Sequence, residues 1–75
     1  MRTNLIIHRL GNTYIDSYTN DRYEFDYSFE EYLPDNDVEI EVYNVRDSTG
    51  YKVGVTPYFY EVLHQAAYDD YLSSL

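Results

Sequence analysis

Few side chains in this sequence have the type and spacing that catalysis requires. There is no cysteine, and the two histidines, His8 and His64, fall in unrelated segments. The sequence contains neither a glycine-rich phosphate loop nor a nucleophile elbow. The adjacent carboxylates of Glu30 and Glu31 could act as a general acid and base, but nothing distinguishes them from a solvated surface. We therefore predict that the protein is not an enzyme and uses no cofactor.

Asp35, Asp37 and Glu39 alternate like the first ligands of a calcium-binding loop. Such a loop needs glycine at its sixth position and a bidentate glutamate at its twelfth, where this chain has Ile40 and Arg46. We predict no dedicated metal site. An acidic module that responds to calcium is a separate hypothesis, and it requires a melting temperature that rises with calcium.

Clustered acidic residues are the main feature of the sequence. Residues 16–47 hold 11 of the 14 acidic residues but only two arginines, so this segment accounts for the whole formal net charge of −9. Carboxylates two apart on one strand face lie about 6.6 Å from each other, a spacing that could imitate the closely spaced phosphates of DNA. Like charges so close cost folding energy. A binding role therefore explains the cluster better than solubility alone.

The predicted partner-binding residues are the clustered acids and two tyrosines among them. Tyrosine is enriched at interface hot spots and can stack on arginine. The candidates are Glu24, Asp26, Glu30, Glu31, Tyr32, Asp35, Asp37, Glu39, Glu41 and Tyr43.

Aromatic residues supply the apolar area that lets so acidic a chain fold. The chain has 11 tyrosines and 3 phenylalanines, and each ring can bury roughly 150–250 Å². No apolar run approaches the roughly 18 residues of a membrane span. We expect a single cytoplasmic domain over residues 1–75. Its acidic surface should repel nucleic acid and membranes and attract basic proteins.

Five strands are expected to position the acidic residues. Residues 5–10, 13–18 and 22–27 read as a meander with turns at Gly11-Asn12 and Asn20-Asp21. Residues 37–45 alternate between apolar and acidic side chains and should form a hairpin with residues 51–55. Ser28 and Glu31 match a capping box, which predicts a short helical turn over residues 29–33.

A C-terminal helix is predicted from Thr56 and Pro57, an N-cap followed by proline at the first helical position. Its apolar stripe is Phe59, Val62, Leu63, Ala66 and Ala67. Asp70 falls on the same stripe, so the helix is expected to end near residues 68–71. The predicted fold class is α+β: an antiparallel sheet of about five strands with the helix packed on one face.

A small, cysteine-free, strongly acidic α+β chain with aromatic residues among its acids resembles the phage-encoded DNA-mimic inhibitors. That group includes anti-restriction and anti-CRISPR proteins. The resemblance concerns size, charge and residues 16–47, and involves no sequence motif. It implies competition with DNA for the groove of a basic DNA-binding protein, such as a CRISPR effector, in the host cytoplasm.

An alternative hypothesis belongs to a different class. The chain could be a small accessory or structural module that acts by homodimerisation or by docking to a larger complex through exposed aromatic residues. A dimer insensitive to salt would favour this alternative. A monomer that displaces DNA from a partner would favour mimicry.

Overall fold

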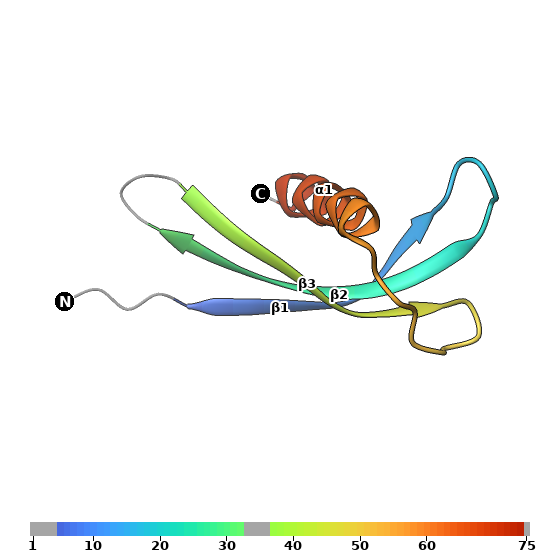
Figure 1. Ribbon diagram of the computed structural model, residues 1–75. Helices are drawn as coiled ribbons and strands as arrows, with labels where there is room; N and C mark the ends of the chain where they lie inside the picture. Colours follow the sequence, from blue (N-terminus) through green and yellow to red (C-terminus); the bar gives the residue numbers. More distant parts are fainter. Residues whose placement is uncertain (1–4, 33–36, 75) are drawn as a thin grey trace.

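Three antiparallel strands and one C-terminal helix make up the computed structural model, which describes residues 5–32 and 37–74. The strands are β1 (Ile6–Ile15), β2 (Arg22–Tyr32) and β3 (Asp37–Asp47), in the order β1-β2-β3, and the helix is α1 (Pro57–Ser73). Figure 1 shows α1 across one face of a curved sheet. The described residues place no helix on the opposite face, which is called the open face below.

The core lies between β2, β3 and α1 and is rich in aromatic rings. Alternate residues of β2 bury their rings beneath α1, because side chains two apart on a strand share a face. On α1 the buried residues recur every four positions, as one face of a helix requires. The buried hydrophobic residues are Phe25, Tyr27, Phe29, Ile40, Val42, Val45, Leu63, Ala67 and Tyr71.

The structure contradicts the prediction of about five strands. The sequence predicts a hairpin that turns at Gly11-Asn12, but β1 continues through this point and stays paired with β2. Gly11 has a φ of 72° and lies in a β-bulge. The Asn12 carboxamide donates hydrogen bonds to the carbonyls of Arg9 and Phe25, at 3.1 and 3.3 Å. A glycine at positive φ suits both a turn and a bulge, and pairing with β2 selects the bulge.

The helical turn predicted for residues 29–33 is also wrong where the structure describes it. Ser28 and Glu31 lie within β2, which continues to Tyr32; residue 33 lies outside the described residues. Phe29 is only 5% exposed and stands opposite Ile40 on β3. A helical turn would remove this ring from the core, so burial outweighs the local capping preference.

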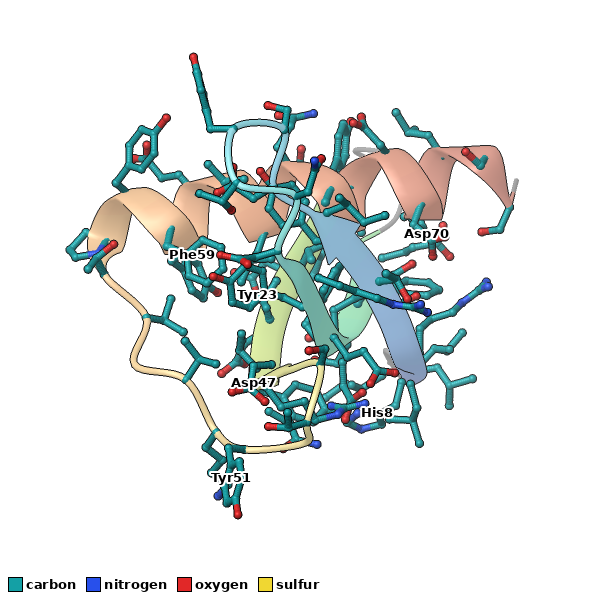
Figure 2. The ribbon with its side chains drawn as sticks, turned by 90° about the vertical axis from the view of Figure 1, so that its right-hand side faces the viewer. His8, Tyr23, Asp47, Tyr51, Phe59 and Asp70 are labelled. Atoms are coloured by element: carbon teal, nitrogen blue, oxygen red, sulfur yellow. The ribbon has the colours of Figure 1, made fainter. Side chains whose placement is uncertain are left out.

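Residues 51–55 do not form the predicted fifth strand. Lys52 makes an isolated bridge to Arg46, and the Val53 amide donates to the carbonyl of Val45 at 3.1 Å. The Asp47 carboxylate accepts hydrogen bonds from the amides of Thr49 and Tyr51, at 2.9 and 3.1 Å, and so fixes a tight turn. Figure 2 shows the Tyr51 ring projecting away from the sheet.

The start of α1 is confirmed, whereas its predicted end is not. The Thr56 hydroxyl accepts a hydrogen bond from the Phe59 amide at 3.1 Å, and proline occupies the first turn. The helix continues to Ser73, because Asp70 accepts a hydrogen bond from the Tyr27 hydroxyl at 2.6 Å. No helix in residues 5–32 and 37–74 is long and apolar enough to cross a membrane.

Candidate protein-interaction surface

The open face of the sheet gathers most of the predicted contact residues. Because Phe25, Tyr27 and Phe29 face α1, the even-numbered residues of β2 lie on the open face. The alternation predicted for β3 is confirmed, since Ile40 and Val42 are buried beneath α1. Six predicted residues share the open face near the end of the β2–β3 pair. We call them the acidic ridge: Glu30, Tyr32, Asp37, Glu39, Glu41 and Tyr43.

Two carboxylates of the acidic ridge stand directly opposite each other. Glu30 pairs with Glu39 in the ladder. The Tyr32 hydroxyl lies 2.8 Å from Glu30 Oε1 and 3.0 Å from Glu39 Oε2. A phenol has one proton to donate, so the hydroxyl can serve one carboxylate at a time. Hydrogen bonding to Glu30 and Glu39 raises the pKa of Tyr32, so the hydroxyl stays protonated at neutral pH.

No ion pair in the described part of the chain involves a ridge carboxylate. The ion pair found there joins Arg46 to Asp26 at 3.2 Å, outside the ridge. Like charges directly opposite in a ladder are destabilising. The charge of the ridge therefore remains available to a ligand or partner.

A hollow of about 330 Å³ opens between β1 and the ridge. Its lining includes Ile6 and Ser28 together with the carboxylates of Glu30, Glu39 and Glu41. A lysine or arginine side chain can lay its aliphatic stem along an apolar surface while its charged head binds carboxylates. The hollow offers both kinds of surface to a basic side chain of a partner.

Tyr43 is held on the open face by a residue that the sequence analysis did not select. His8 Nδ1 lies 2.9 Å from the Tyr43 hydroxyl, and the two rings are 5.9 Å apart and nearly perpendicular. Figure 2 shows His8 on the side of the sheet that faces away from α1. Side chains alternate between the two faces along β1 and β3. This alternation is the sequence signal that places His8 and Tyr43 on the same face.

Asp26, a predicted partner contact, lies in the interior of the structure and is bonded to three other residues of the chain. Its side chain is almost wholly buried. It accepts hydrogen bonds from the Gly11 amide, Asn44 Nδ2 and an Arg46 guanidinium nitrogen, at 2.9, 2.8 and 3.2 Å. Burial raises the pKa of Asp26, but the bonds from Asn44, Gly11 and Arg46 outweigh it and hold the pKa below its ordinary value.

Three other predicted contacts do not belong to the ridge. Glu24 is half-buried and stands opposite Arg46 in the ladder. Glu31 is on the face covered by α1, where its carboxylate accepts a hydrogen bond from the Tyr71 hydroxyl at 2.5 Å. That bond raises the pKa of Tyr71. Asp35 lies outside the described residues.

Comparison of the chain with protein-family models, with curated proteins and with solved structures gave no match. The geometry of the open face is therefore the basis for the functional argument.

Proposed function

We propose that this protein is a non-enzymatic inhibitor whose acidic ridge occupies the DNA-binding groove of a basic partner protein. The observation that carries the proposal is the ladder pair of Glu30 and Glu39. These two carboxylates are held face to face, share one hydroxyl donor, and have no cation beside them among the described residues. A groove lined with lysine and arginine would neutralise these two carboxylates. Binding would therefore remove the repulsion between them that is present in the free protein.

The spacing within the ridge supports imitation of a nucleic acid. Glu39 and Glu41 lie two residues apart on β3, so their Cα atoms are about 6.6 Å apart and their side chains leave the same face. Glu30 adds a charge from the neighbouring strand, roughly 5 Å away across the ladder. A sheet holds these anions in fixed positions, whereas a flexible acidic segment would lose entropy on binding.

The class of partner follows from the same chemistry. The acidic surface repels nucleic acids and attracts a protein that binds phosphates. Inhibition of the anti-CRISPR or anti-restriction type, in which a phage protein keeps target DNA from a nuclease complex, fits this mode of binding. The hollow beside Ile6 would receive one basic side chain of that groove.

Affinity capture tests the proposal. The immobilised protein is exposed to a bacterial lysate at low salt, and bound proteins are then eluted with short duplex DNA. A basic nucleic-acid-binding protein should elute from the native chain and be lost when Glu39→Lys and Glu41→Lys are combined. A control with Asp21→Lys and Glu61→Lys has the same net charge, changes exposed residues outside the ridge, and should still capture the partner.

Two results would refute mimicry. One is equal capture by the ridge variant and the control variant, which would show that only net charge matters. The other is a partner that stays bound in excess duplex DNA, which would show that the ridge and DNA do not share a site.

A further inference from the structure

The two outer strands of the sheet differ in how their free edges are protected. On β3 the Val42 amide donates to the Tyr60 hydroxyl at 3.3 Å, and the Val45 carbonyl accepts from the Val53 amide at 3.1 Å. Three acids of the ridge, Asp37, Glu39 and Glu41, also lie along this strand. Charges and covering segments are the usual means of keeping an edge from pairing with another chain.

The edge of β1 has no such cover among the described residues. The Val42 amide donates to Tyr60, so it points away from β2. Val42 and its ladder partner Tyr27 therefore do not bond each other through their backbones, and the backbone groups of Tyr27 point toward β1. Arg9, opposite Tyr27, must then direct its groups inward. Backbone groups alternate along a strand in an antiparallel ladder, so those of Ile6 and His8 point outward and are free to pair.

The side chains of β1 are also unlike those of the rest of the molecule. Residues 5–15 contain no acidic residue, and their one permanent charge is Arg9. The charge of Arg9 does not lie along the free edge, because its guanidinium packs 5.6 Å from the centre of the Phe29 ring and donates to Ser74 Oγ. Residues 5–15 expose large apolar side chains, among them Leu5, Ile6, Leu10 and Ile15.

We infer that β1 pairs with β1 of a second copy of this chain, which joins two sheets into one of six strands. Two chains that each carry a net charge of −9 repel each other, and β1 is the free sheet edge without acids in the described structure. A two-fold axis beside His8 places Ile6 of one copy opposite Leu10 of the other. The contact is isologous and closes after two copies, so it does not propagate into fibres. The ridge carboxylates, on β2 and β3, then lie one and two strands in from the paired β1 strands.

Sedimentation equilibrium of the purified chain tests this inference. The native protein should be a dimer at micromolar concentration. His8→Pro removes an outward amide that no ladder bond among the described residues uses. An edge strand tolerates proline at such a position, and the variant should be monomeric. His8→Ala loses the same imidazole but keeps the amide, so it should remain a dimer.

A second pair of variants tests the apolar contribution and does not depend on proline. Leu10→Lys places a charge on the edge and should weaken dimerisation at least tenfold. Leu72→Lys changes another exposed leucine, on α1, by the same charge and should leave the dimer intact. Circular dichroism confirms that each variant is folded. A monomeric native protein, or a folded Leu10→Lys variant that dimerises as well as Leu72→Lys, would overturn the inference.

Discussion

Asp26 shows that the same residue type serves two purposes in this chain. The ridge carboxylates form no ion pair among the described residues, whereas Asp26 lies between two irregular strands and accepts three hydrogen bonds. Its partners include Gly11 on β1 and Asn44 on β3, the two strand residues with positive φ, at 72° and 55°. One buried carboxylate therefore holds a backbone irregularity on each side of β2.

Asp26→Asn should destabilise the protein by about 2 kcal/mol. The amide keeps the size of the side chain but loses the charge and leaves Arg46 without its anion, and hydrogen bonds to charged groups are worth roughly 1.5–3 kcal/mol. Urea unfolding measures the change. Asp21→Asn, at an exposed residue, is the matched control and should shift stability by less than about 0.5 kcal/mol.

The effect of this substitution should depend on pH. Because the pKa of Asp26 is lower in the folded protein than in the unfolded chain, its stabilisation is fully present above about pH 4 and is lost as the pH falls through the folded-state pKa. The stability difference between the native protein and Asp26→Asn should therefore shrink in acid. A difference that stays constant from pH 6 down to pH 2 would contradict this assignment.

At the level of elements, the two bulges explain why the sheet can curve beneath α1. A bulge adds one residue to one strand and increases the local bend. The β1–β2 register shifts between Arg9 and Asn12, and the β2–β3 register shifts between Glu24 and Asp26. Both shifts flank the middle of β2, and Figure 1 shows the strands curving there under the helix.

Gly11→Ala should destabilise the fold by about 1 kcal/mol. A φ of 72° is unfavourable for alanine, although an added Cβ would meet no atom within 4 Å. Gly54→Ala is the matched control, because Gly54 has the same open space without a positive φ, and its effect should stay within about 0.5 kcal/mol. Thermal unfolding of the two variants compares them directly, and equal losses would argue against a required left-handed residue at position 11.

At the level of the whole molecule, the charge distribution separates two surfaces. The ridge carries acids on β2 and β3, whereas β1 has no acid between residues 5 and 15. The proposed partner would bind the ridge by attraction between opposite charges. The proposed dimer would form at β1 despite repulsion between two acidic chains.

Salt should therefore act on the two interactions in opposite directions. Raising salt from about 0.1 to 1 M shortens the Debye length from about 10 to about 3 Å, which should weaken capture of the basic partner by at least tenfold. The same change screens repulsion between the copies and should strengthen the dimer. Titrations of both equilibria against salt measure this, and a parallel response would contradict either the charge attraction at the ridge or the charge repulsion between the two copies.

The sequence alone is sufficient to predict the features that depend on local chemistry and on short-range periodicity. It located the acids in one segment and gave the alternation of β3, in which Val42 is buried and Glu39 and Glu41 are exposed. It also identified Thr56 as the residue that caps the helix. Each of these follows from residues that are close in the chain.

Packing between distant segments determines the features for which local signals allow two outcomes. Gly11-Asn12 suits a turn or a bulge, and Ser28 with Glu31 suits a helix cap or a strand; burial of Phe29 and pairing with β2 selected the second outcome in both cases. Asp26 and Glu31 look like their acidic neighbours in sequence. Asp26 is bonded by Gly11, Asn44 and Arg46, and Glu31 is bonded by Tyr71. These bonds hold both carboxylates away from the ridge, and the partners come together only when distant segments of the chain pack.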